Sequence, residues 1–217
     1  MKLKAVLFDL DGVLIDTEGT YTTFWNEMDR LHPTGVENFA QTIKGSTLTK
    51  ILSTYFPDPE AQADVSRRLN QLETGMKYRV FPGVFELLEG LRAKGIKTAI
   101  VTSSNRIKMG HLFGEEPRLD ELTDALVTDE DVTASKPDPQ PYIIGATKLG
   151  LDPEECIVVE DSVSGLESGR RAGAFVLGVA TTNPRAVVEP LADMTVDALA
   201  DVSADCLVDK FENNTKS

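Results

Sequence analysis

Two aspartates one residue apart, Asp9 and Asp11, follow a short apolar run in the stretch FDLDGVLIDTE. Neighbouring carboxylates repel each other unless a cation or a proton offsets their charge. A divalent cation would remove that repulsion and hold one acid ionised as a nucleophile toward phosphorus, while the other carried a proton. The pair taken alone also fits an ordinary turn before Gly12, because aspartate favours turns.

Three further polar segments follow apolar runs: VTSSN with Thr102, TASKPDPQPY with Lys136, and VVEDS with Glu160 and Asp161. Ligands of open parallel sheets bind beyond the carboxyl ends of the strands. If the apolar runs are parallel strands, acids, hydroxyls and one lysine meet at the same edge of the sheet. The sequence therefore predicts a single site built from four separate segments.

A metal at that edge would have only oxygen ligands. Asp9 and Asp161, with the backbone carbonyl of Asp11 and waters, form a set suited to Mg²⁺, which prefers octahedral oxygen coordination. Glu160 either contacts the metal through water or orients Lys136, and the sequence leaves both roles open. We expect Mg²⁺ as the cofactor, with Asp9, Asp11, Glu160 and Asp161 as the metal-site residues.

A dianionic phosphoryl group at the same edge needs positive charge and hydrogen-bond donors. Lys136, the Thr102 hydroxyl and the Ser103 backbone N–H at a helix start can supply them, and Asn105 belongs to the same segment. Each segment also has an ordinary structural interpretation. The hydroxyls could cap a helix, the lysine could be solvated, and the acids could be first-turn residues favoured by a helix dipole. All four ordinary interpretations would have to hold together.

The elements that position these residues follow from hydrophobic patterns. Five short apolar runs, each bounded by polar residues or glycine, predict buried strands. They are Ala5–Phe8, Thr98–Val101, Ala125–Val127, Ile157–Val159 and Phe175–Val179. Helical patterns alternate with these runs from residue 82 onward, as in a parallel sheet covered on both faces.

The connection between the first two strands is too long for one crossover, because Asp9 and Thr102 are 93 residues apart. The residues between about 17 and 79 are helical in pattern throughout, with three amphipathic segments and no convincing strand. We therefore predict an α/β core domain of residues 1–16 and 80–217, with a helical domain of residues 17–79 inserted after the first strand.

Composition excludes several partners. A net charge of −13 opposes nucleic-acid binding, which requires clustered lysine and arginine. No apolar run approaches the roughly 20 residues that span a bilayer, and Asp9 interrupts the first run before it could form a signal-peptide core. We expect a cytoplasmic monomer that acts on a small phosphorylated metabolite and binds neither membrane nor nucleic acid.

The four segments FDLDGVLIDTE, VTSSN, SKPDPQPY and VVEDSVSGLESGRRAG resemble, in order and spacing, the four motifs of the haloacid dehalogenase superfamily. The resemblance covers residues 3–200, and within the superfamily it is strongest to the branch of β-phosphoglucomutase and small sugar-phosphate phosphatases. It implies an α/β fold with a Rossmann-like parallel sheet and a small all-helical cap inserted after strand 1. The resemblance also implies roles: Asp9 as nucleophile, Asp11 as acid/base, Thr102 and Lys136 as phosphate-binding groups, and Glu160 with Asp161 as the acidic metal motif.

Two departures bear on the reaction. The mutase has a cap histidine and a cap arginine that holds a second phosphate, and Tyr21 and Leu48 stand at those positions here. We therefore expect a Mg²⁺-dependent phosphatase that hydrolyses a sugar or polyol phosphate through an aspartyl phosphate. A β-phosphoglucomutase-like phosphotransferase is the alternative, with a second-phosphate site supplied by other cap cations: Lys44, Arg67, Arg68, Lys77 or Arg79. A non-catalytic binding module on the same fold is a third hypothesis.

Overall fold

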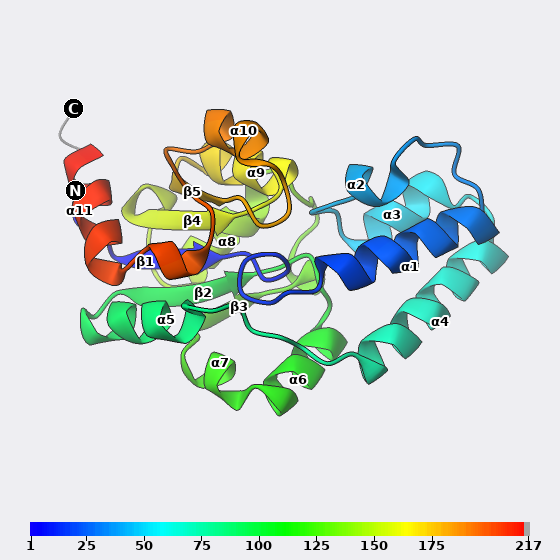
Figure 1. Ribbon diagram of the computed structural model, residues 1–217, viewed down its shortest axis with the longest axis horizontal. Coiled ribbons are helices and arrows are strands. Elements are labelled where there is room, and N and C mark those ends of the chain that lie inside the picture. Colours follow the sequence, from blue (N-terminus) through cyan, green and yellow to red (C-terminus); the bar gives the residue numbers. More distant parts are fainter. Residues whose placement is uncertain (215–217) are drawn as a thin grey trace.

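The computed structural model describes residues 1–214, and within them the central sheet has six parallel strands in the order β3-β2-β1-β4-β5-β6 (Figure 1). The strands are β1 (Ala5–Phe8), β2 (Lys97–Val101), β3 (Ala125–Val127), β4 (Cys156–Glu160), β5 (Phe175–Val179) and β6 (Met194–Val196). The chain order reverses at β1, which pairs with both β2 and β4. A ligand site is expected at such a switch point, beyond the carboxyl ends of these strands.

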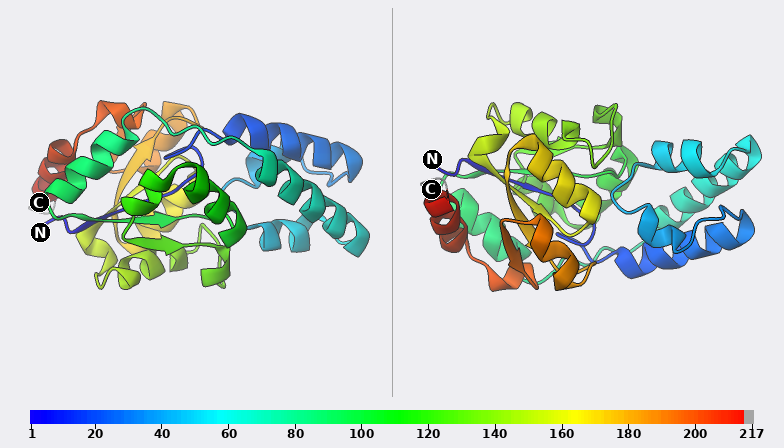
Figure 2. Two further views of the ribbon diagram at one scale, coloured as in Figure 1. Left: turned by 90° about the horizontal axis from the view of Figure 1, so that it is seen from below. Right: turned by 90° about the horizontal axis from the view of Figure 1, so that it is seen from above.

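Helices cover both faces of the sheet, as the alternation of apolar runs and helical patterns predicted (Figure 2). Those after β1 in the core are α5 (Val84–Ala93), α6 (Arg106–Glu115), α7 (Pro117–Glu121), α8 (Gln140–Lys148), α9 (Val163–Ala172), α10 (Arg185–Val188) and α11 (Ala204–Asn214). The predicted fold class, a Rossmann-like α/β core with a parallel sheet, is confirmed.

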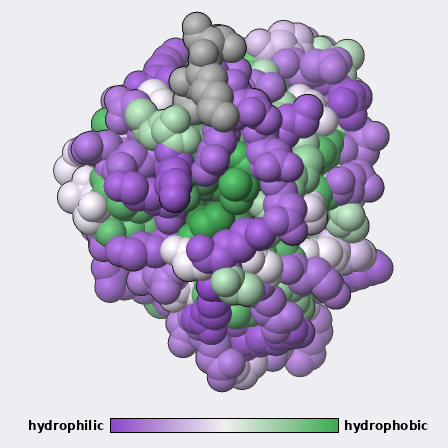
Figure 3. Space-filling view, turned by 90° about the vertical axis from the view of Figure 1, so that its left-hand side faces the viewer, coloured by the Kyte–Doolittle hydropathy of each residue, from purple (hydrophilic) through white to green (hydrophobic). Residues whose placement is uncertain are grey.

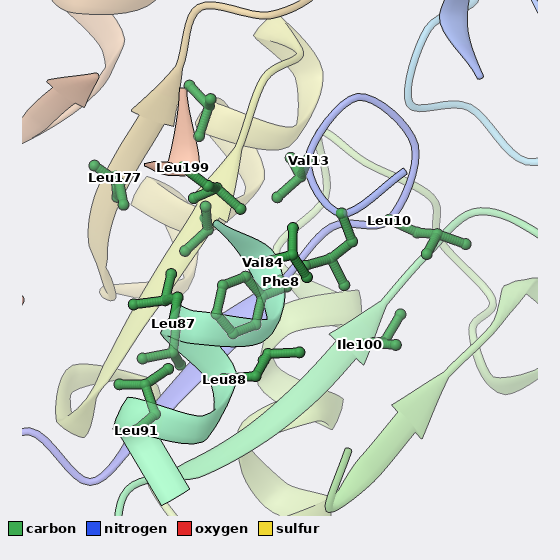
Figure 4. Close-up of a cluster of buried hydrophobic side chains, with 14 of the residues drawn as sticks. Phe8, Leu10, Val13, Val84, Leu87, Leu88, Leu91, Ile100, Leu177 and Leu199 are labelled. Atoms are coloured by element: carbon green, nitrogen blue, oxygen red, sulfur yellow. The ribbon is translucent and has the colours of Figure 1, made fainter. Parts of the chain in front are cut away.

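Alternation along β1 divides the core into two layers. Val6 and Phe8 belong to a large cluster with α5 and α11, whereas Ala5 and Leu7 belong to a second cluster with α8. Successive side chains of a strand point to opposite faces, so a strand buried on both faces is apolar throughout. The close-up shows the apolar side of α5, with Leu87 and Leu88, packed against Phe8 (Figure 4).

Between β1 and α5 the chain forms four helices, which make up a separate body beside the core (Figures 1 and 2). They are α1 (Glu18–Leu31), α2 (Phe39–Thr42), α3 (Leu48–Tyr55) and α4 (Pro59–Gly75). This segment, residues 17–79, is called the cap below. It has its own apolar cluster, in which Phe24, Trp25 and Phe39 are buried. The two connections to the core lie side by side, since the Asp16 amide donates to the Arg79 carbonyl at 2.8 Å. The domain boundaries at residues 16/17 and 79/80 stay a prediction.

Several elements were not predicted, namely β6, α2, α7, α10 and α11. Strand β6 has three residues with the polar Thr195 at its centre, so no unbroken apolar run marks it. Helix α2 has four residues, which is about one turn and too short for a periodic pattern. None of these elements carries a residue of the predicted site.

The end of the molecule away from the cap is mostly hydrophilic, with a small hydrophobic group near its centre (Figure 3). The N-terminus and α11 lie at this end, and β1 runs from it toward the cap (Figure 1). No helix within residues 1–214 combines the length and the apolar character that crossing a membrane requires.

Candidate active site

Asp9 and Lys136 are in direct contact at the carboxyl ends of the central strands. Asp9 follows β1, and its Oδ1 lies 2.6 Å from Lys136 Nζ, although 127 residues separate the two in sequence. The same ammonium donates to Glu160 Oε1 at 2.6 Å and to the Val101 carbonyl at 3.1 Å. Since an ammonium has three hydrogens, each N–H of this buried lysine has an acceptor.

Glu160 is fully buried and accepts hydrogen bonds at both carboxylate oxygens. Oε1 accepts from Lys136 and, at 2.7 Å, from the Tyr142 hydroxyl. Oε2 accepts from the backbone N–H groups of Asp161 and Ser162 and from the Ser162 hydroxyl, at 3.0–3.2 Å. Because both of its oxygens accept hydrogen bonds, the Glu160 carboxylate is held in one position and can orient the Lys136 ammonium.

Carboxylate oxygens of Asp9, Glu160 and Asp161 lie within 4.8 Å of one another, which makes this acidic cluster a possible cation site. Burial raises the pKa of Asp9 to about 7, against the opposing effect of Lys136. Burial also raises the pKa of Asp161 well above its ordinary value. Gly12, with φ of +85°, lies so close that a Cβ there would collide with the Asp161 carboxylate. Glycine at this position therefore lets the backbone approach this acid closely.

Asp11 lies in a different environment from Asp9. Both of its oxygens accept from the ammonium of Lys108, at 2.6 and 2.7 Å, and Lys108 is almost fully buried. The Thr17 hydroxyl donates to Oδ1, and the Ser104 hydroxyl donates to Oδ2 at 3.1 Å. The two aspartates therefore have different lysine partners, which separates the charges that the sequence places one residue apart.

The segment after β2 combines helix capping with a position at the site. Asn105 caps α6, since its side chain accepts from the Lys108 amide at 2.9 Å. The buried Thr102 hydroxyl accepts from the Ser104 amide at 3.0 Å. Thr102, Ser104 and Asn105 line the cavity between core and cap together with Asp9. The capping interpretation thus holds for Asn105, and its role in phosphate binding stays a prediction.

Two hydrogen bonds fasten the cap onto the core beside these residues. The Ser103 hydroxyl donates to the Gly45 carbonyl at 2.9 Å, and the Ser164 hydroxyl donates to the Lys44 carbonyl at 2.8 Å. Gly45 has φ of +77°, and a Cβ there would collide with Ser164. The loop before α3 therefore approaches the core closely, and it closes one side of the cavity.

The cations that line this cavity within the described part of the chain are Lys44 and Lys108. Lys44 Nζ lies 2.6 Å from Glu18 Oε2, and Lys108 is held by Asp11. The other cap cations considered for a second phosphate do not line it. Arg67 and Arg68 pair with Asp64, Lys77 pairs with Glu115, and Arg79 lies at the linker.

The aromatic side chains of the cap lie mainly in the apolar cluster of the cap itself. Phe24 and Trp25 are buried in the apolar cluster of the cap, and Trp25 and Tyr21 also line the cavity. His32 has a structural contact, with Nε2 3.0 Å from Asp64 Oδ2, and His111 is exposed.

Comparisons with known proteins identify the class. The family model of haloacid dehalogenase-like hydrolases matches residues 6–179, and the chain therefore belongs to that family. The predicted resemblance is confirmed. A structure of β-phosphoglucomutase from Clostridium difficile aligns with 99% of this chain and all of that one, with a TM-score of 0.81. At 19% identity this likeness concerns the fold alone.

The curated relatives include two phosphatases. Hexitol phosphatase A of Escherichia coli (strain K12) is 34% identical over 186 residues, which is 82% of this chain and 84% of that protein. N-acetylmuramic acid 6-phosphate phosphatase of Pseudomonas putida is 31% identical over 187 residues, which is 82% of this chain and 83% of that protein. These relatives support the predicted enzyme class, a phosphoric monoester hydrolase.

The structure brings the predicted residues to one place but adds partners that sequence reasoning missed. Lys108 was not predicted, although it lies four residues before Leu112 on the buried side of α6. Glu73 of the cap, also buried, was not predicted either. An apolar helix face shows where a charged residue is buried, but it does not name the partner.

Proposed function

We propose that the chain is a Mg²⁺-dependent phosphatase that hydrolyses a sugar or polyol phosphate through an aspartyl phosphate on Asp9. The observation that supports it most is the contact of Asp9, which lines the cavity between core and cap, with Lys136, which is itself held by Glu160. The cytoplasmic location and the monomeric state stay predictions.

The acidic cluster fits a magnesium ion, because its donors are all carboxylate oxygens. Asp9 and Asp161 would hold the ion together with the Asp11 carbonyl. Glu160 would act through Lys136, since both of its oxygens already accept hydrogen bonds. When bound, Mg²⁺ would offset the negative charge of the acids and of the phosphoryl group.

The residues divide the reaction into two displacements. Asp9 attacks phosphorus and the bond from phosphorus to the leaving oxygen breaks, while Asp11 gives that oxygen its proton. Asp11 then takes a proton from water, whose oxygen attacks the phosphoaspartate, releases phosphate and restores Asp9. Lys136 and the Thr102 hydroxyl would stabilise charge on the phosphoryl oxygens. The cap excludes bulk water during the first step.

Hydrolysis is favoured over phosphoglucomutase-like transfer by the cations at the cavity. Lys44 and Lys108 are already paired with Glu18 and Asp11, so neither is a ready ligand for a second phosphate. Tyr21 and Leu48, at the positions of the mutase histidine and arginine, also line the cavity and are uncharged at neutral pH. The names of the relatives, with a hexitol and an N-acetylmuramic acid phosphate, support a hydroxylated substrate.

The test is phosphate release from a panel of sugar, polyol and nucleotide monophosphates and pyrophosphate, with Mg²⁺ and with a chelator. We expect release that requires Mg²⁺ and falls at least about 10³-fold in Asp9→Asn. Asp16→Asn, at an exposed neighbouring aspartate, is the matched control and should retain activity. No release from any substrate by the parent, or an active Asp9→Asn, rejects the proposal. Conversion of β-glucose 1-phosphate to glucose 6-phosphate with a bisphosphate primer would instead establish the mutase.

A further inference from the structure

Glu73 is a buried carboxylate of the cap with one oxygen unused. It lies in the last turns of α4 and is 6% exposed. Oε1 accepts from the Tyr21 hydroxyl at 2.9 Å. Oε2 is buried and has no hydrogen-bond partner within residues 1–214. Because Glu73 also lines the cavity above Asp9 and Asp11, a bound molecule could supply the missing partner.

The position of Glu73 is unfavourable for folding in two independent ways. A buried carboxylate without its full set of hydrogen bonds is costly. A negative charge near the carboxyl end of a helix also opposes the helix dipole, whereas Glu60 in the first turn of the same helix has the favourable placement. Residues that reduce stability in this way are retained where activity needs them.

Neighbouring groups explain how the cap tolerates this carboxylate. The ammonium of Lys108 lies 4.6 Å from the centre of the Tyr21 ring and acts electrostatically on Glu73. Tyr21 thus connects Glu73 of the cap to Lys108 of the core. Lys108 in turn holds Asp11. The free oxygen of Glu73 therefore belongs to the same cavity as the proposed acid/base.

A second carboxylate oxygen in the cavity is unused as well. Asp129, which follows β3, lines the same cavity, and its Oδ1 is buried without a partner among the described residues. Carboxylate oxygens accept hydrogen bonds from hydroxyls and repel phosphate. Two such acceptors suit a leaving group with several hydroxyls and no second phosphate.

We propose that Glu73 determines specificity by accepting, through Oε2, a hydrogen bond from a hydroxyl of an uncharged, polyhydroxylated leaving group. This inference rests on the proposed function and names the substrate class of the same site. It makes Glu73 a group that binds substrate and takes no part in phosphoryl transfer.

The experiment compares glucitol 6-phosphate with hexyl phosphate, which has the same chain length and no hydroxyl. The measured quantity is the ratio of kcat/KM for the two substrates, with Mg²⁺ present. Glu73→Ala removes the acceptor, and we expect the ratio to fall about tenfold or more, mainly through KM for the hexitol phosphate. Glu73→Gln keeps the volume and removes the charge, so its ratio should fall by an intermediate factor.

Glu60→Gln, an exposed position on the same helix, is the control and should leave the ratio at the parent value. Ratios within twofold of the parent in both Glu73 variants overturn the inference, as does an equal loss on both substrates. Melting temperatures identify a variant that has failed to fold, and in that case the other variant decides. If the parent releases phosphate from neither substrate nor from the wider panel, the proposed function fails, and this inference fails with it.

Discussion

The buried charges around Lys136 and the buried carboxylates farther along the cavity differ in how many of their hydrogen-bonding atoms have partners. At the sheet edge, both oxygens of Glu160 and all three N–H groups of Lys136 have partners. Farther along the cavity, Glu73 Oε2 of the cap and Asp129 Oδ1 of the core have no hydrogen-bond partner among residues 1–214. A saturated network holds its members in one arrangement, whereas an unpaired buried group stays costly until something binds it. We infer that the network around Lys136 fixes the chemistry and that Glu73 of the cap, together with Asp129, selects the leaving group.

Removing one member of the saturated network should lower the free energy of unfolding strongly. Lys136→Met leaves the Asp9 and Glu160 carboxylates buried without their cation, and such a loss costs about 3–5 kcal/mol of unfolding free energy. Urea denaturation without added metal measures this quantity. Lys94→Met breaks the surface pair with Asp205 and should cost less than about 1 kcal/mol. Equal effects in the two variants contradict the contrast between network and surface.

Lys108 contacts both Asp11 of the core and the Tyr21 ring of the cap, and its substitution should lower kcat. Lys108→Met releases Asp11 from its two contacts, and we expect kcat for a good substrate to fall about 10- to 100-fold, part of what general acid–base catalysis contributes. Lys108→Arg should recover part of kcat, because it restores the charge. A loss confined to KM, or no recovery by arginine, contradicts a positioning role. Assays well below the melting temperature keep stability effects apart.

Removing a hydrogen bond between cap and core should have a smaller effect on substrate binding. Ser164→Ala removes one hydrogen bond to the loop at Lys44, worth about 0.5–1.5 kcal/mol. If the closed cap holds the substrate, KM should rise about 2- to 10-fold with little change in kcat. Ser53→Ala, an exposed cap position that bonds within its own helix, is the matched control. A KM equal to that of the control rejects the contact as part of substrate binding.

The smallest expected effect is that of Glu73→Gln on the stability of the protein. This effect should depend on pH, which distinguishes it from the others. Burial raises the pKa of Glu73 above its ordinary 4.5, so folding disfavours the ionised form. This opposition is absent below pH 4.5 and develops as the pH rises through the raised pKa. Glu73→Gln should therefore melt about 2–4 °C above the parent at pH 8, the shift that about 1 kcal/mol produces. The gain should vanish near pH 4.5.

Glu60→Gln is the control for this measurement, since it lies at the opposite end of α4, where a negative charge is favourable. It should not stabilise the protein at pH 8. A gain for Glu73→Gln that is the same at both pH values would show that charge is not its cause.

The sequence by itself determined that the apolar runs form a parallel sheet and that the polar segments after them meet at one edge of that sheet. Runs such as Ala5–Phe8 are apolar at every position because both faces of the sheet are covered, and parallel strands all end at one edge. Asp9 and the segment of Lys136 were therefore expected at the same edge of the sheet, although Lys136 lies nine residues beyond the end of β3. The helical content of the cap followed from the same periodic patterns.

Only the tertiary structure decided which charges pair. Lys108 meets Asp11 across 97 residues, and Tyr21 meets Glu73 across 52. Periodicity shows which face of a helix is buried, but α6 and α4 could each have buried that face against several neighbours. The partner of a buried charge depends on how the cap packs on the core. That arrangement is the sum of many weak contacts between segments far apart in sequence, and no local pattern records it.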